Sequence, residues 1–174
     1  MTIESALREA IGCEERIRDQ YREAAAAATT PDAKRFFSLL ERDEDSHVRY
    51  LGHKLVQWKD QGIVDAVGLG SALPDTKRLE AAAAKAGANL SDPGAAAGRM
   101  LGGEEEAMRR ALKAEEETTA FYRTLVADLP KEARPLFSRF LDIEEGHARI
   151  VRAELDLAER TGHWFDARVF DLED

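Results

Sequence analysis

The sequence has one cysteine and five prolines in 174 residues, and none of its apolar runs is long. A single cysteine excludes an internal disulfide and any metal site built from four cysteines. Crossing a bilayer takes roughly 20 consecutive apolar residues, so we expect no membrane segment. The N-terminal stretch MTIESALREAIGCEERI carries charges every few residues and does not resemble an export signal. We therefore expect a cytoplasmic protein.

Basic residues are also few relative to acidic ones. The chain has 25 Lys and Arg against 34 Asp and Glu, for a net charge of −9. A nucleic-acid surface needs clustered positive charge, and the basic residues form no long cluster, so we expect no nucleic-acid partner. The length and the mixture of apolar and charged residues are typical of one soluble globular domain, residues 1–174.

Patterns typical of β-strands are missing, whereas helix-forming residues dominate. The sequence predicts an all-α fold, with Gly and Pro at the junctions between helices. The start of the third helix is open, because it could begin at Pro93 or after the Gly102-Gly103 pair. A short additional helix is expected from about Asp75 to Ala86. The four long helices are predicted over about 2–28, 31–62, a stretch ending near 129, and 131–162.

The chain also repeats itself. DAKRFFSLLERDEDSHVRYL aligns with EARPLFSRFLDIEEGHARIV at a shift of 100 residues, and EERIRDQYR aligns with EEETTAFYR at a shift of 101. Each half is therefore predicted to be a helical hairpin, over residues 1–62 and 104–162. The connector 63–103 would join the hairpins, and 163–174 would form a tail. Two such hairpins make a four-helix bundle with internal pseudo-twofold symmetry.

Polar residues interrupt the apolar stripe of each predicted helix. Apolar residues at alternating intervals of three and four face the core of a helical protein. The stripe positions that carry acids or histidines are Glu14, Glu44, His47, Glu115, Glu144 and His147. The neighbouring acids fall off the stripes, and we expect them to point to water. They are Glu15, Asp43, Asp45, Glu116, Glu117 and Glu145.

Four carboxylates in one bundle core would repel each other and lose their hydration. Two divalent cations would neutralise them. One Glu from each of two helices with Glu-x-x-His from each of two others is the ligand pattern of dimetal carboxylate bundles. Mixed oxygen and imidazole ligands favour iron, with manganese also possible. Tyr21 and Tyr122 share the face of the first glutamate of each half, so they could hydrogen-bond a ligand. The competing interpretation is that these residues form ordinary salt bridges.

The motifs CEERIRDQY, ERDEDSH, AEEETTAFY and DIEEGH resemble the rubrerythrin branch of the ferritin-like superfamily. This resemblance covers both predicted hairpins and implies a ferritin-like bundle that binds two iron ions. It implies that Glu14, Glu44 and His47 serve one set of metal positions and that Glu115, Glu144 and His147 complete the pair. Glu44 and Glu144 would be the bridging carboxylates.

The sequence departs from that family at two points. Peroxide-reducing rubrerythrins usually have an extra glutamate three residues after the third-helix ligand, where this chain has Thr118. Many also carry a rubredoxin module with paired Cys-x-x-Cys motifs, which this chain lacks. The resemblance therefore implies an external electron donor, such as a rubredoxin-like protein.

Three other features look chemically attractive but have simpler interpretations. Cys13 should be a small buried side chain that points away from the metals, and His53 should lie on the surface. The tail with His163, Trp164, Phe165 and Phe170 should dock on its own bundle or on a partner, which makes it a candidate contact of a homodimer.

Four functions follow from these residues. The first is a diiron redox enzyme that reacts with hydrogen peroxide or O2, of the peroxide reductase or ferroxidase type. The second is iron oxidation and storage. The third is a diiron or dimanganese oxygenase or catalase on the same scaffold. The fourth is a bundle without catalytic activity that contacts other proteins.

Overall fold

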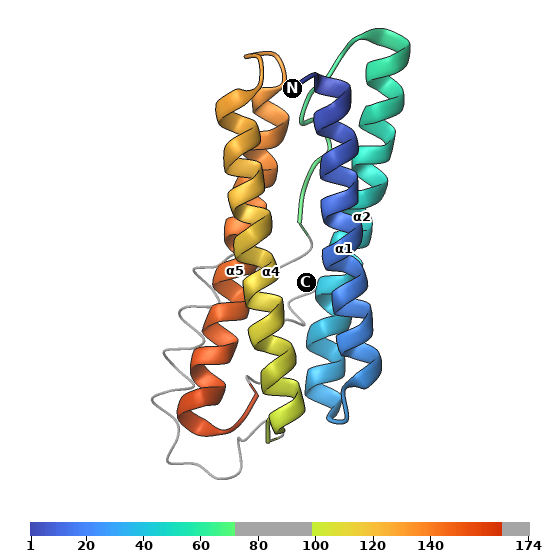
Figure 1. Ribbon diagram of the computed structural model, residues 1–174. Helices are drawn as coiled ribbons and strands as arrows, with labels where there is room; N and C mark the ends of the chain where they lie inside the picture. The colour runs from blue at the N-terminus through green and yellow to red at the C-terminus, as the bar shows by residue number, and fades with distance from the viewer. Residues whose placement is uncertain (72–98, 165–174) are drawn as a thin grey trace.

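Four long helices make up most of the computed structural model, which describes residues 1–71 and 99–164 (Figure 1). Apart from an isolated bridge between Arg99 and His163, no β-structure occurs in this part of the chain. The predicted all-α class is therefore confirmed. The helices are α1 (Ile3–Ala27), α2 (Pro31–Gln61), α4 (Gly102–Asp128) and α5 (Arg134–Thr161).

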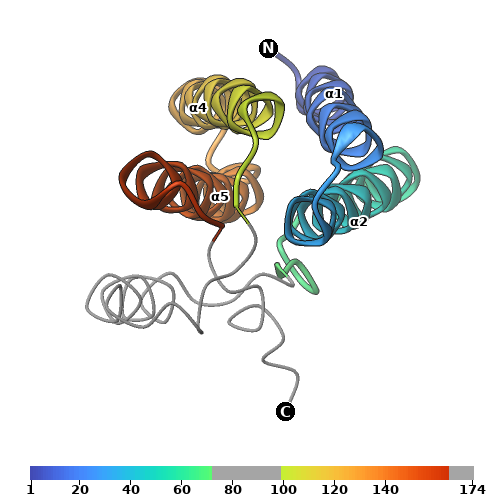
Figure 2. The same cartoon turned by 90° about the horizontal axis from the view of Figure 1, so that it is seen from below.

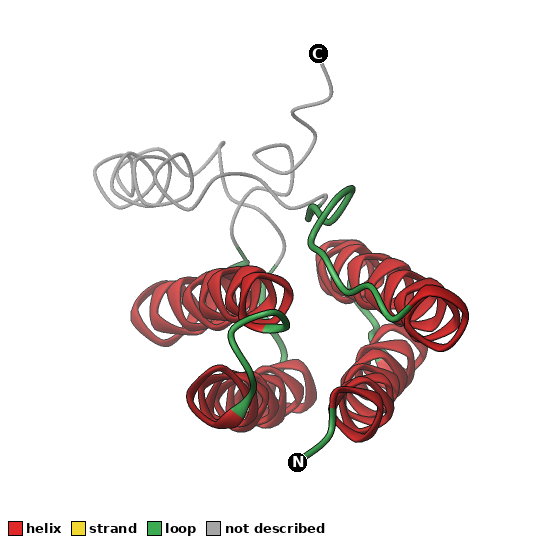
Figure 3. Cartoon of the chain, turned by 90° about the horizontal axis from the view of Figure 1, so that it is seen from above, coloured by secondary structure: helices red, strands yellow, loops and turns green. Residues whose placement is uncertain are grey.

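The helices lie side by side as a bundle. α1 packs against α2, α4 packs against α5, and α1 also contacts α4. The two end views show the two pairs facing each other (Figures 2 and 3). α2 ends at the opposite end of the bundle from the start of α4, so the connection between them has to cover the length of the bundle (Figure 1). The short helix expected at 75–86 lies outside the described residues.

Local signals set the helix ends. The Thr2 and Thr30 side chains act as N-caps, because each accepts a hydrogen bond from a backbone N–H in the first turn, that of Ser5 in α1 and that of Ala33 in α2. Gly62 and Gly162 end α2 and α5 with φ of +66° and +74°, a left-handed conformation that glycine adopts without strain. Both glycines were predicted as helix ends.

Two helix starts were less well predicted. α4 begins at Gly102, and the residues just before it, 99–101, are not helical, so the helix starts at the glycine pair itself and not after it, and it does not extend back to Pro93. α5 begins at Arg134 rather than near Lys131, with Pro135 in its first turn. Proline fits the first turn of a helix because its missing N–H has no partner there.

The core consists of two apolar clusters with a polar layer between them. One cluster contains Phe36, Phe37 and Trp164, and the other contains Phe137 and Phe140. On each helix, one apolar cluster lies before the buried glutamate and the other lies after it, or after the Glu-x-x-His pair where there is one. These glutamates are Glu14, Glu44, Glu115 and Glu144. The polar stripe positions of the four helices therefore meet in one layer at mid-bundle.

A buried carboxylate fastens one end of the bundle. Glu104, at the start of α4, accepts bonds from the backbone and hydroxyl groups of Thr29 and Thr30 in the α1–α2 turn. It also accepts from Leu101 N at 3.2 Å and from Trp164 Nε1 at 3.0 Å. Sequence patterns did not identify this role of Glu104. The described start of the tail thus docks on its own bundle, while Phe165 and Phe170 lie outside the described residues.

None of the described helices is both long enough and apolar enough to cross a membrane.

Candidate metal centre

All six polar stripe residues are buried, with at most 1% of each side chain exposed. They come from all four helices, so no single helix could build the cluster alone. Two overlapping groups of ligand atoms result, and within each group the atoms lie within 4.8 Å of one another. Such clusters can hold metal ions. The first group is Glu14, Glu44, His47 and Glu144, and the second is Glu44, Glu115, Glu144 and His147.

The first group gathers around Nδ1 of His47. This atom lies 3.1 Å from Glu44 Oε2, 3.4 Å from Glu14 Oε2 and 3.8 Å from Glu144 Oε1. A cation with oxygen and nitrogen ligands at about 2.0–2.2 Å places its ligand atoms about this far apart. We refer to this group as the His47 site.

The second group gathers around Nδ1 of His147 in the same way. Glu44 Oε1 lies 2.7 Å from this nitrogen, Glu144 Oε2 lies 3.7 Å away and Glu115 Oε1 lies 3.8 Å away. We refer to it as the His147 site. Glu44 and Glu144 each present one oxygen to either histidine, which is the arrangement expected of carboxylates that bridge two ions.

Many of the converging atoms have no hydrogen-bond partner. Although Glu44 Oε1 and His147 Nδ1 are close, their angles do not fit a hydrogen bond. An unpaired buried polar atom is destabilising by roughly 1–3 kcal/mol, and native interiors contain few of them. Cations at the centre of each group would engage these atoms, so the residues fit a pair of metal ions. The unpaired atoms include Glu14 Oε2, Glu44 Oε1, Glu115 Oε2, both oxygens of Glu144 and His147 Nδ1.

Three of the four glutamates in this cluster have raised pKa values, because several acidic groups lie close together away from water. The pKa of Glu14 is raised to about 7 and that of Glu115 to about 8. Burial is the largest cause of both shifts, and repulsion by the charge of Glu44 adds to it. Burial and the charges of Glu14 and Glu44 raise the pKa of Glu144 well above its usual value. Without a cation, these carboxyl groups therefore retain protons near neutral pH.

The histidines shift in the opposite sense to that expected from burial alone. Burial opposes the charged imidazolium, but Glu14 and Glu44 outweigh it and raise the pKa of His47 to about 10. Glu44 and Glu144 raise the pKa of His147 well above its usual value. Glu44 is also buried, yet His147 and His47 hold its pKa well below its ordinary range. Protons thus provide the positive charge that metal ions would replace.

The two tyrosines cross between the helix pairs. Tyr21 of α1 donates a hydrogen bond to Glu115 Oε1 of α4, and Tyr122 of α4 donates to Glu14 Oε1 of α1. Both phenols are buried. Each tyrosine thus holds the glutamate of the other half, whereas the sequence predicted a hydrogen bond to a ligand without identifying which one.

Asp43 is a residue whose role was missed, and the expectation that it points to water is wrong. Its side chain is 1% exposed, and its Oδ2 accepts from His147 Nε2 at 2.9 Å and from Ser71 Oγ at 2.6 Å. The signal was present in the sequence, because Phe36, Leu40, Asp43 and His47 follow one another at intervals of four, three and four. A hydrogen on Nε2 of a neutral imidazole leaves Nδ1 free to bind a metal.

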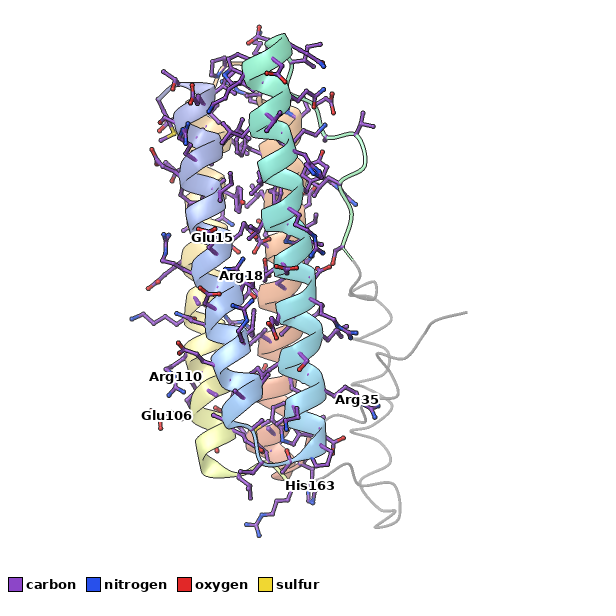
Figure 4. The ribbon with its side chains drawn as sticks, turned by 90° about the vertical axis from the view of Figure 1, so that its right-hand side faces the viewer. Glu15, Arg18, Arg35, Glu106, Arg110 and His163 are labelled. Carbon is purple, nitrogen blue, oxygen red and sulfur yellow. The ribbon has the colours of Figure 1, made fainter. Side chains whose placement is uncertain are left out.

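The remaining off-stripe acids behave largely as expected. Glu15, Glu116 and Glu117 are exposed, and Glu15 lies on the outer face of α1 in Figure 4. Asp45 and Glu145 are partly exposed and pair with Arg49 and Arg123.

Cys13 and the other histidines are not part of either metal group. Cys13 is buried, burial raises the pKa of its thiol, and its Sγ lies 3.6 Å from Thr118 Oγ1 of α4. His53 is exposed, as expected. His163 lies near the end of the bundle (Figure 4), where its Nδ1 is 2.8 Å from the carbonyl oxygen of Thr161.

Comparisons with protein-family models, curated proteins and solved structures find no match to this chain. The case for a function rests on the residues and their geometry.

Proposed function

We propose that this protein binds two iron ions between its four helices and uses them in a redox reaction with hydrogen peroxide or O2. The observation that carries the proposal is the pair of overlapping ligand groups, which share Glu44 and Glu144 and have one histidine Nδ1 each. The donor set of carboxylates and imidazoles suits iron or manganese. The resemblance of the sequence motifs to rubrerythrins points in the same direction.

The protein's own residues would divide the work as follows. Glu14 and His47 would bind one ion, Glu115 and His147 the other, and Glu44 and Glu144 would bind both. Two iron ions supply a store of two electrons and Lewis acidity at one place. By accepting a hydrogen bond from Nε2, Asp43 would hold the His147 ring with Nδ1 directed at the ion.

The tyrosines and the apolar clusters complete the environment. Tyr21 and Tyr122 donate hydrogen bonds to Glu115 and Glu14, so they would hold the terminal carboxylates in place. The apolar clusters on both sides keep bulk water away from the charged layer. The redox proposal implies an external electron donor, such as a rubredoxin-like protein, and a homodimer remains a further prediction.

The experiment that tests this proposal is an anaerobic titration with Fe(II), followed by rapid mixing with peroxide or with O2. We expect two irons per chain and faster oxidation by peroxide. Glu115→Ala should lower the iron content, whereas the exposed matched control Glu116→Ala should leave it unchanged. Uptake of many irons per chain would indicate storage instead, and absence of binding would leave a bundle without catalytic activity. Equal effects of the two substitutions would contradict the ligand assignment.

A further inference from the structure

A cavity of about 600 Å³ lies between α1 and α4. Its wall includes Ala24 and Ala28 of α1 and Ala107 and Ala111 of α4, with Tyr21 and Phe37 also lining it. Ligand pockets for small organic molecules are typically about 300–1,000 Å³, whereas the share of liquid volume of a water molecule is only about 30 Å³. The cavity is therefore far larger than a small oxidant requires.

The internal repeat explains why the cavity exists at one end of the α1–α4 interface. At the shift of 101 that aligns α1 with α4, Ala24 and Ala28 correspond to Leu125 and Leu129. Both leucines are almost completely buried and pack with Leu7 in the apolar cluster of the other end. The leucine pair fills the space that the alanine pair leaves open.

The cavity also reaches the neighbourhood of the metal centre. Tyr21, which lines it, donates its hydroxyl hydrogen to Glu115, a residue of the His147 site. One side chain therefore separates a molecule in the cavity from a candidate metal ligand. Phe37 packs beside Tyr21 with ring centroids 6.4 Å apart, and both side chains are almost completely buried, so they close the inner end of the cavity.

The charges around the cavity decide which kind of molecule fits. Its charged lining residues are Glu23, Glu104 and Arg110. Arg110 already pairs with Glu106 at 3.0 Å, on the outer side of α4 in Figure 4. Glu104 is occupied by the hydrogen bonds that fasten the end of the bundle. An anion would meet net negative charge here, whereas an uncharged apolar molecule would contact the accessible side chains of Ala24, Ala27 and Ala28.

We propose that the cavity between α1 and α4 is a binding site for an uncharged, apolar organic molecule of aromatic or short aliphatic type. The proposal goes beyond the proposed redox reaction and does not need the metal ions, because none of the cavity's lining residues is a candidate ligand. A molecule bound there would lie against Tyr21 and the hydrogen bond that this tyrosine makes to Glu115.

The test is a fluorescence titration of the 174-residue protein, metal-free and iron-loaded, with phenylnaphthylamine, an uncharged dye, and with its sulfonated analogue. We expect the uncharged dye to bind with about one molecule per chain and more tightly than the sulfonate. The double variant Ala24→Leu/Ala28→Leu copies the leucines of the other end and should weaken binding at least about tenfold by filling the cavity. The control Ala26→Leu changes an exposed alanine of the same helix outside the cavity and should not affect binding.

A measurement on the unmodified protein keeps the test decisive if the double variant does not fold. Alanine methyl NMR should show shifts at Ala24, Ala28, Ala107 and Ala111 on dye addition. Ala6 and Ala10, the counterparts of Ala107 and Ala111 at the closed end, should not move. Absence of binding, preference for the sulfonate, equal binding by the leucine variant, or shifts at Ala6 and Ala10 would each overturn the proposal. Shifts at the cavity alanines that change with protein concentration would also overturn the proposal, because a second copy of the chain would then occupy the cavity.

Discussion

His47 and His147 occupy equivalent positions in the two halves of the chain, but their surroundings differ. Each presents Nδ1 to three glutamates. Nε2 of His147 is bonded to Asp43, whereas Nε2 of His47 has no hydrogen-bond partner and lies 3.8 Å from the same carboxylate. The residue equivalent to Asp43 in the second half is Ile143, an apolar side chain. The repeat therefore duplicates the atoms that face the candidate metal sites, but only His147 has a carboxylate bonded to its outer nitrogen.

This difference indicates that the two proposed metal positions are unequal. A carboxylate bonded to the outer nitrogen fixes the orientation of the ring and makes the other nitrogen a better ligand. We therefore expect the His147 site to bind its ion more tightly than the His47 site.

The largest expected effect on metal affinity comes from removing a glutamate that both sites share, compared with one that belongs to a single site. Glu44→Ala removes an oxygen from both sites and should abolish tight binding of both ions, whereas Glu14→Ala should affect mainly the His47 site. The loss with Glu44→Ala should exceed the roughly 10–100-fold weakening seen when a supporting residue is removed. Equilibrium titration with Fe(II) under anaerobic conditions measures both. A Glu44→Ala protein that still binds one ion with the original affinity would contradict the bridging arrangement.

The next effect concerns pH. Glu14 and Glu115 have pKa values of about 7 and about 8 in the metal-free protein, and the pKa of His47 is about 10. These groups must lose their protons to bind metal, so affinity should rise as the pH rises from about 6 to about 8. Calorimetry in buffers of different ionisation enthalpy should detect the protons that are released. Affinity that does not depend on pH in this range would show that the carboxyl groups do not compete with metal.

The same shifts set how the stability of the metal-free protein depends on pH. The folded-state pKa of Glu14 is raised above its ordinary value of 4.5, so the folded protein binds more protons than the unfolded chain between these values. The corresponding stability is present below about pH 4.5 and is lost as the pH rises through about 7. The raised pKa of His47 acts in the same direction between 6.5 and about 10. Thermal unfolding should therefore begin at lower temperature as the pH rises from 5 to 9.

A smaller effect tests the support of His147 directly. Asp43→Asn should weaken the His147 site by about 10–100-fold and leave the His47 site nearly unchanged, because the amide cannot hold the ring as the carboxylate does. Asp45→Asn is the matched control, since Asp45 pairs with Arg49 on the outside of α2. Iron titration of the three proteins measures the difference. Equal losses at both sites would mean that Asp43 supports the whole cluster and not one histidine.

The smallest expected effects on metal affinity are those of the two tyrosines, and they should be equal. Tyr21→Phe and Tyr122→Phe each remove one hydrogen bond to a terminal glutamate, which is worth about 0.5–1.5 kcal/mol. Each should therefore weaken metal binding by about the same few-fold factor. Two strongly unequal effects would show that the tyrosines, and not only Asp43, distinguish the two halves.

Much of the fold and of the cluster could be predicted because the signals are local. Stripe positions of Glu14 and Glu144 follow from helical periodicity, and Gly62 and Gly162 end helices through their own backbone conformation. The burial of Asp43 could have been predicted from its helical spacing to Leu40 and His47, but its partners could not, because His147 belongs to the other half and Ser71 to the connector. The cavity could not be predicted either, because its walls come from two helices, α1 and α4, that are far apart in the sequence.

The most direct test of the central claim is a crystal structure of the iron-loaded protein with anomalous scattering measured at the iron absorption edge. The account predicts two anomalous peaks in the middle layer of the bundle, one beside Nδ1 of His47 and one beside Nδ1 of His147. Glu44 and Glu144 should contact both peaks. Peaks elsewhere, a single peak, or none in protein crystallised with saturating Fe(II) would contradict it.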